Sequence, residues 1–219
     1  MKAKNSTKMD FTYRQILKWG DKREEEADPL MIKVIRDKFD LKDSDFEMKY
    51  LSGAEPVKLE KPSALKRNQL KFLTTIVGNE NIKSDDFSRA KFSCGKFYGE
   101  LLDLRLNLVP FPPDAVVSPK SHDEVVKIVE YCNNEKIPII PVGGQSSVTG
   151  ALEAPLGGIA LDLTKHLNKI LKINDANKTV TVQAGIFGPA LEDELNRHGF
   201  TCGHFPQSFE YSTAGGWIA

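Results

Sequence analysis

The chain has few cysteines and no long apolar run. Its three cysteines, Cys94, Cys132 and Cys202, lie far apart along 219 residues. Zinc sites and redox dithiols need closely paired cysteines, so the spacing indicates neither, and we interpret the thiols as reduced and intracellular. No stretch approaches roughly 18 consecutive apolar residues, and the polar start MKAKNSTKMDFTYR lacks the apolar core of a secretory signal. We therefore expect no membrane span.

The chain also lacks an excess of charge of one sign, because thirty basic residues balance thirty acidic ones. A strong positive field attracts nucleic acids and anionic membranes, so this balance gives no reason to expect either as a partner. No cluster has metal-ligand spacing and no Ser-His-Asp order stands out. We predict no metal and assign no catalytic residue. With 40% hydrophobic and 27% charged residues, the composition is typical of a globular protein.

Prolines divide the chain. Pro110, Pro112 and Pro113 stand within four residues, and proline removes a backbone donor and fixes φ, so this cluster ends any regular element. We predict a mostly helical or irregular region over residues 1–110 and a second domain over residues 111–219. In the first region we expect a helix from Asp28, a helix over 96–106 and irregular chain over 41–71.

Strand and helix signals alternate in the second region, which indicates an α/β or an α+β fold, and we predict the latter. Apolar runs predict strands over 114–119, 137–142 and 159–163, the second of them buried, and a hairpin turned at 175–178. Ser121 and Glu124 predict a capping box for a helix, and Gly199 predicts the end of another helix over 189–198. The residues expected to face inward are Val125, Ile128, Val129, Cys132, Val180, Val182, Ala184, Leu191 and Leu195.

Small residues gather directly behind the strand over 137–142, in the stretch PVGGQSSVTG. Adjacent glycines let backbone N–H groups approach a ligand closely, and consecutive N–H groups in such a turn form an anion-binding concavity. The hydroxyls of Ser146 and Ser147 add neutral donors. The stretch matches neither the Walker pattern nor the dinucleotide fingerprint. It suits a pyrophosphate, and an ordinary Gly-Ser turn stays an alternative.

A second stretch, PQSFEYSTAGGW over 206–217, again offers hydroxyls and a glycine pair, beside aromatics that can flank a flat ring. Two such loops about sixty residues apart favour a bound dinucleotide over turn chemistry alone. A third stretch, AGIFG over 184–188, precedes a helix whose N-terminus would favour an anion, although turn chemistry explains it almost as well.

Four histidines complete the candidates. We expect His122, His166 and His198 at the surface, in a first helical turn, a polar turn and near a helix end. Only His204 lies between two candidate ligand loops, so it is the one histidine for which contact with the ligand or its pocket deserves a test.

Taken together, these stretches resemble a known family. PVGGQSSVTG resembles the pyrophosphate loop Pro-x-Gly-Gly-Gly-Thr-Ser of the FAD-binding domain shared by the vanillyl-alcohol oxidase superfamily. TVQAGIFGPALEDELNRHGFTCGHFPQSFEYSTAGGW is similar to the continuation found in alkylglycerone-phosphate synthases and their bacterial relatives. The similarity covers residues 111–219 and extends upstream through CGKFYGELLDLR and KWG. It implies a PCMH-type FAD domain of two subdomains, incomplete at its C-terminal end, with the flavin between them and a separate cap domain.

The resemblance also implies which residues bind FAD. Gln145 stands where the family usually has a third glycine, and Ser146 replaces threonine. Related oxidases with covalently tethered flavin often carry histidine at the place of Gln145, so this residue indicates non-covalent FAD. The implied cofactor-binding residues are Pro141, Val142, Gly143, Gly144, Gln145, Ser146 and Ser147 in the first stretch, and Gln207, Ser208, Phe209, Glu210, Tyr211, Ser212 and Thr213 in the second.

For the full-length protein the resemblance implies ether lipid synthesis, in which a long-chain alcohol replaces the acyl group of acylated dihydroxyacetone phosphate. Two alternatives stay open: an FAD-linked 2-hydroxy-acid dehydrogenase or oxidase that uses the same loops with a different cap, and a non-catalytic module in which Gln145 marks a degenerate flavin site. The implied partner is a small-molecule or lipid substrate, and a homodimer stays open.

Two expectations concern the ends and the location of the chain. The chain stops at GGWIA, a pattern typical of a turn that enters a buried element, so we expect an N-terminal piece that is inactive alone. We expect a cytoplasmic protein, or a peroxisomal one if the source is eukaryotic, in which case the address would lie at the extreme C-terminus.

Overall fold

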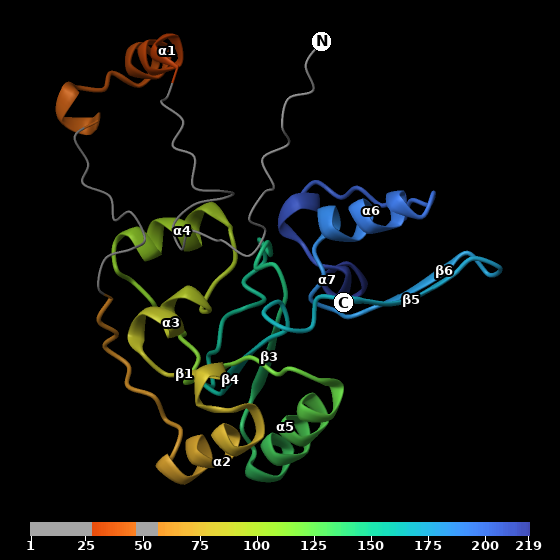
Figure 1. Cartoon of the computed structure of the whole chain (residues 1–219). Coiled ribbons are helices and arrows are strands. Elements are labelled where there is room, and N and C mark those ends of the chain that lie inside the picture. Colours follow the sequence, from red (N-terminus) through yellow and green to blue (C-terminus); the bar gives the residue numbers. More distant parts are fainter. Residues whose placement is uncertain (1–27, 47–56) are drawn as a thin grey trace.

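A computed structural model describes residues 28–46 and 57–219 (Figure 1). The polar start and the KWG similarity lie outside the described residues. In chain order the elements are α1 (Pro29–Phe39), η1 (Asp43–Phe46), α2 (Arg67–Val77), η2 (Asn79–Asn81), β1 (Ile82–Lys83), α3 (Asp86–Lys91), α4 (Tyr98–Arg105), β2 (Ala115–Val117), α5 (His122–Glu135), β3 (Ile139–Val142), β4 (Ile159–Asp162), β5 (Ile170–Asn174), β6 (Thr179–Val182), α6 (Gly188–Arg197), η3 (Phe209–Tyr211) and α7 (Ala214–Ile218). This mixture of helix and sheet, preceded by a helical region, confirms the α+β prediction. Within the described ranges no helix is long and apolar enough to cross a membrane.

Helix α1 begins where the sequence predicts. The carboxylate of Asp28 accepts a hydrogen bond from the Leu30 N–H at 2.9 Å, and Pro29 takes the first helical position, where its missing N–H costs nothing. The helix ends at Asp40, whose left-handed conformation has a φ of 52°. None of the residues of α1 is buried, so the helix adds no side chain to the cores of the described part.

Four strands form the main sheet in the order β1-β2-β4-β3. Strands β2, β4 and β3 run parallel, whereas β1 pairs antiparallel with β2. Strand β4 has neighbours on both sides and is buried throughout. Strand β3 lies at the edge, where Ile139 and Ile140 are half-buried and Pro141 is exposed. The prediction of a buried strand is therefore wrong, and proline is tolerated because one side of an edge strand makes no ladder bonds.

Helices α2 and α5 lie side by side and cover one face of the sheet (Figure 1). Leu73 and Val77 of α2 and Ile128 and Cys132 of α5 are fully buried against this face. Val129, which we expected to face inward, is 45% exposed, because α5 buries a narrower stripe. Helix α2 also begins inside the stretch predicted to be irregular, so that prediction is wrong at its C-terminal end.

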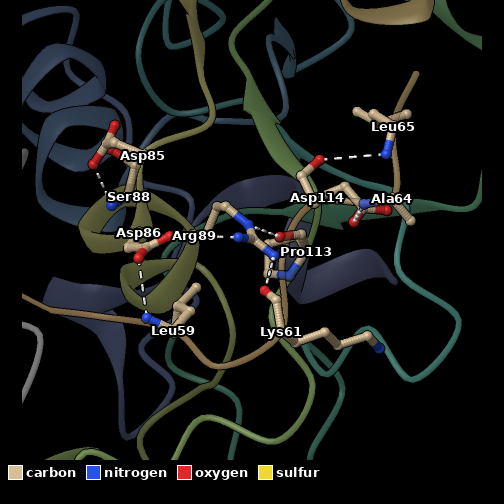
Figure 2. Close-up of polar contacts among 11 residues, drawn as sticks. Leu59, Lys61, Ala64, Leu65, Asp85, Asp86, Ser88, Arg89, Pro113 and Asp114 are labelled. Carbon is tan, nitrogen blue, oxygen red and sulfur yellow. Dashed lines mark hydrogen bonds and ion pairs between the residues drawn. The ribbon is translucent and has the colours of Figure 1, made fainter. Parts of the chain in front are cut away.

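Residues 57–64, which we call the strap, are hydrogen-bonded to side chains of α3 and of Asp114, which directly precedes β2 (Figure 2). Three side chains hold its backbone: Asp86 accepts from the Leu59 N–H at 3.0 Å, Arg89 donates to the Lys61 carbonyl at 3.0 Å, and Asp114 accepts from the Ala64 N–H at 2.6 Å. Arg89 is 2% exposed and also donates to the Pro113 carbonyl at 2.8 Å. The strap and α2 thus pack with residues beyond Pro110. The division of the chain at residue 110 stays a prediction.

The second sheet is the hairpin β5–β6, turned at the predicted place and packed against α6. Leu191 and Leu195 of α6 are 2% and 4% exposed, as expected, and Val180 and Val182 are half-buried. Ala184 is exposed, contrary to expectation, because β6 ends at Val182 and the alternation stops there. Two small bodies result, one around each sheet, and the candidate residues lie where they meet.

Candidate functional site

The two candidate stretches lie against one another. We call residues 141–147 the glycine loop and residues 207–213 the second segment. A Cβ placed on Gly144 would overlap the carbonyl oxygen of Tyr211, and one on Gly143 would overlap the hydroxyl of Thr213. At Gly144 any side chain would force the two backbones apart, so glycine is required there for this contact, whereas at Gly143 a side chain would displace the Thr213 hydroxyl. The structure therefore brings together residues that the sequence separates widely.

The glycine loop begins at the carboxyl end of β3, beside the carboxyl end of β4, where Val142 pairs with Asp162. In parallel sheets, ligands bind outside this edge. A cavity of about 290 Å³ lies here. Its lining residues are Lys91, Phe92, Gly143, Gly144, Gln145, Asp162, Thr164, Lys165 and Phe187. Six of these nine lie outside the predicted cofactor-binding residues. Phe187 belongs to the third candidate stretch, AGIFG, whereas no local signal could have found the other five, since two separate parts of the chain supply them.

The donor chemistry of the loop suits a pyrophosphate. The backbone N–H groups of Gln145, Ser146 and Ser147 donate to no acceptor in the described part of the chain, and neither does the Ser146 hydroxyl. Unpaired N–H groups in succession form an anion-binding concavity. Lys91 and Lys165 line the adjoining cavity, so its field also favours an anion.

Lys165 is held in place by Asn81, which lies at the end of η2. The Lys165 ammonium donates to the Asn81 side-chain oxygen at 2.8 Å and to the Glu80 carbonyl at 3.0 Å. His166 lies in the predicted turn and is half-buried, and its Nε2 lies 2.7 Å from the same Asn81 oxygen. Burial, and then the charge of Lys165, lower the pKa of His166. The neutral ring donates through Nε2 and helps to fix the lysine.

Asp162 lines the cavity and is 6% exposed. One carboxylate oxygen accepts from the Thr164 N–H at 2.9 Å and its hydroxyl at 2.7 Å, and the other accepts from the Ser118 hydroxyl at 3.1 Å. Buried carboxylates are tolerated when they are fully hydrogen-bonded. Asp162 therefore shapes the turn after β4 and is not a free base.

Gln145 has a left-handed backbone with a φ of 57° and is 9% exposed. Its side-chain N–H donates to the Lys91 carbonyl at 2.7 Å. The side chain therefore has a protein partner of its own, at the C-terminal end of α3.

In the second segment, Ser212 and Thr213 are buried, with exposed fractions of 6% and 1%. The Ser212 hydroxyl accepts from the Trp217 indole N–H at 2.6 Å, and the Thr213 hydroxyl accepts from the Gly216 N–H at 3.4 Å as the cap of α7. Each hydroxyl keeps its own proton for a further acceptor. The other residues are half-buried, except for the exposed Gln207; they are Ser208, Phe209, Glu210 and Tyr211.

Aromatic rings lie beside the second segment. His204 is exposed and its ring meets the Trp217 ring edge-on at 5.0 Å, while Phe209 stacks on Trp217 at 6.3 Å. Contact of His204 with a ligand stays a prediction. His122 and His198 are exposed, as expected.

In the third stretch, AGIFG, close packing accounts for the two glycines. The Gly188 N–H already donates to the Ser212 carbonyl at 3.3 Å, and a Cβ on Gly185 would overlap the Leu163 carbonyl. Among the described residues, no group of three His, Cys, Asp or Glu side chains could hold a metal ion.

Comparison with known proteins defines the class. Residues 113–219 match the family described as FAD binding domain. The chain also shares its fold with a solved alkyldihydroxyacetonephosphate synthase, at a TM-score of 0.73 and 32% identity over 79% of this chain and 33% of that one. Residues 113–219 are therefore an FAD-binding domain of the PCMH type, a class whose cofactor is FAD.

Within this class the chain is similar to the alkyldihydroxyacetonephosphate synthases. It is 47% identical over 124 residues to the synthase of Caenorhabditis elegans, covering 55% of this chain and 21% of the relative. It is 33% identical over 174 residues to that of Trypanosoma brucei brucei, covering 77% and 28%. The chain thus spans about a quarter of the length of these relatives.

Proposed function

We propose that the pyrophosphate of FAD lies on the glycine loop, Pro141–Ser147, and that the second segment, Gln207–Thr213, contributes further contacts. The observation that carries this proposal is the row of three unpaired N–H groups at Gln145, Ser146 and Ser147, beside a cavity lined by two lysines. The same geometry supports non-covalent binding, because Gln145 offers no nucleophile for a tether.

Each group has a defined part in binding. The loop N–H groups and the Ser146 hydroxyl donate to phosphate oxygens, and the positive charges of Lys91 and Lys165 stabilise the two negative charges of the pyrophosphate. Gly143 and Gly144 allow the second segment to close over the loop. When bound, FAD supplies the reactive ring, while the chain supplies orientation and electrostatics.

For the whole protein we propose the activity of an alkyldihydroxyacetonephosphate synthase, in which a long-chain alcohol replaces the acyl group of acyl-dihydroxyacetone phosphate. The support is the identity of 33–47% to two such synthases and the fold shared with a solved structure of such a synthase. No described residue is assigned to the chemical step.

Titration with FAD tests the site. The purified chain is expected to quench the fluorescence of added FAD, and ADP is expected to compete because it carries the same pyrophosphate. Replacing Ser146 by Ala removes one donor and should weaken binding several-fold, by about 1 kcal/mol. Val148→Ala, in the same loop but 55% exposed, is the control and should bind FAD normally. A wild-type chain that ignores FAD would reject the site.

A second assay tests the activity of the whole protein. Acyl-dihydroxyacetone phosphate and hexadecanol are supplied together, and mass spectrometry should detect the alkyl ether and the released fatty acid. Bleaching of the bound flavin by D-lactate under anaerobic conditions, without ether formation, would instead select a 2-hydroxy-acid dehydrogenase.

The proposal extends to assembly and location. We propose a homodimer, which light scattering during size-exclusion chromatography would show as twice the mass of one chain. We also propose a cytoplasmic or, in a eukaryote, peroxisomal enzyme, which imaging of a fluorescent fusion would test.

A further inference from the structure

Gln145 combines three features that are uncommon in one residue. It is a non-glycine residue with a left-handed backbone, it is 9% exposed, and its side chain is engaged by a backbone carbonyl. A left-handed backbone is unfavourable for a residue with a Cβ and persists only where the surroundings impose it. Contacts from neighbouring residues must therefore stabilise the left-handed backbone at Gln145.

Residues 91–96, which we call the seat, provide that support. At one end, the Lys91 carbonyl accepts the Gln145 side-chain N–H at 2.7 Å. At the other end, the Lys96 N–H donates to the Ser147 carbonyl at 2.7 Å. A Cβ on Gly95 would overlap this same Ser147 carbonyl, so the two backbones meet closely. The seat thus holds Gln145 and Ser147, the first and last of the residues whose N–H groups stay unpaired.

We infer that Gln145 is a positioning residue for FAD, which acts by bridging the glycine loop to the seat. The inference rests on the proposed function and extends it to residues 91–96, which lie outside the region that matches the FAD-binding family. The bridge fixes the loop before the cofactor arrives, so less conformational freedom is lost when FAD binds.

The chemistry of the bridge selects glutamine. The acceptor is a carbonyl at the C-terminal end of α3, so the side chain must donate a hydrogen bond. Glutamate accepts only, when ionised, and would place a negative charge beside the phosphates. Asparagine has the same amide but is shorter by one methylene, and it tolerates a left-handed backbone. Glycine relieves the backbone strain but has no side chain to form the bridge.

Two measurements distinguish the effect of the Gln145 hydrogen bond on the loop from its effect on FAD binding. The first measurement is amide hydrogen exchange at Lys96 in the protein without FAD, because this N–H donates to the Ser147 carbonyl and so reports on the position of the loop. Exchange is expected to accelerate about two- to tenfold in Gln145→Asn and Gln145→Gly, as the loss of one hydrogen bond implies. Unchanged exchange in both variants would overturn the inference.

The second measurement is the dissociation constant for FAD. It is expected to rise about two- to tenfold in the Asn and Gly variants, and further in Gln145→Glu, because of the added charge. Tighter binding by Gln145→Gly would show that backbone strain outweighs the bridge and would also overturn the inference.

A matched control is Gln69→Asn. Gln69 is likewise a buried glutamine, 7% exposed, whose amide donates to Glu135 at 3.0 Å, on the opposite side of the sheet. It should lower the melting temperature without changing Lys96 exchange or FAD binding. If the wild-type chain fails to bind FAD, the proposed function fails, while the exchange data still decide whether the bridge holds the loop.

Discussion

At the scale of single residues, Glu192 shows how one buried carboxylate can order a loop. It is 6% exposed on α6 and accepts three hydrogen bonds: from the Thr201 hydroxyl at 2.8 Å, the Cys202 N–H at 2.8 Å and the Gly203 N–H at 3.1 Å. A carboxylate can accept all three because it carries no hydrogen. The turn that leads into the second segment therefore depends on this side chain.

Replacing Glu192 by Gln keeps the shape but removes the negative charge that strengthens the bonds from the Cys202 and Gly203 N–H groups, and the Thr201 hydroxyl would have to accept from the amide instead of donating. We expect a loss of about 1–3 kcal/mol in the free energy of unfolding, measured by urea denaturation. The control is Glu194→Gln, in the same helix, where an exposed ion pair with Arg197 contributes at most about 1 kcal/mol. Equal losses in the two variants would contradict the role of Glu192.

The three cysteines should differ in reactivity. Burial raises the pKa of Cys132 to about 11, and it is the largest of the effects that raise the pKa of Cys94 to about 11. At pH 8 both thiols are therefore protonated and unreactive, whereas Cys202 is exposed. Ellman's reagent should modify one thiol rapidly in the folded chain and all three in denaturant. Cys202→Ser should abolish the rapid phase.

At the scale of elements, the contact between the glycine loop and the second segment is set by backbone. The overlap at Gly144 involves the carbonyl of Tyr211 and the Cα of Ser212, which cannot rotate away as a side chain could. The loop and the second segment therefore form one unit, and a substitution that moves one of them should also move the other.

Gly144→Ala tests this unit. The added methyl should separate the two segments, lower the free energy of unfolding by about 1–3 kcal/mol and weaken FAD binding. Gly216→Ala is the matched control, because its Cβ would meet only the Thr213 hydroxyl, at an ordinary 3.5 Å, and alanine favours the helix α7. Calorimetry and FAD titration of both variants distinguish overlap from a general effect of the methyl group.

At the scale of the whole molecule, the packing of α2 bears on the predicted division at residue 110. Leu73 and Val77 belong to the same buried cluster as Ala115, Val117 and Ile159. Strand β1 likewise joins the sheet of the second region through β2. These contacts favour a single cooperative unit that includes residues before Pro110.

Leu73→Ala provides the test. Removing this fully buried side chain should cost about 2–5 kcal/mol, and hydrogen exchange should accelerate in β4 as well as in α2, because both lose the same core. Exchange changes confined to residues before 110 would instead support two independent domains.

Local signals in the sequence predicted local structure well. The caps at Asp28 and Ser121 and the hairpin turn at 175–178 each depend on residues within a few positions, and the structure has them where expected. The glycine loop was found for the same reason. Its direct contact with the second segment was not predicted, since spacing alone could not place the two stretches together.

The remaining walls of the cavity could not be predicted, because they form only when distant segments pack. Lys91, Asp162 and Lys165 carry no motif, and each becomes relevant through its place at the end of α3 or β4. Helix α2 was not predicted for a similar reason: it is stabilised by packing on the face of a sheet that forms from distant residues. The sequence marked Gln145 as a departure from the family pattern. The hydrogen bond from its side chain to the Lys91 carbonyl is seen only in the structure.

The strap has a consequence for the order of folding. Its three backbone hydrogen bonds to Asp86, Arg89 and Asp114 join positions 27, 28 and 50 residues apart. Closing loops of this length before their ends are structured is entropically unfavourable, so contacts of high sequence separation form late. Refolding should therefore show the Ala64 amide, whose bond spans 50 residues, gaining protection after the Ile159 amide of β4, which donates to the Pro138 carbonyl only 21 residues away. The C-terminal end of the strap would then dock after β3 and β4 have paired.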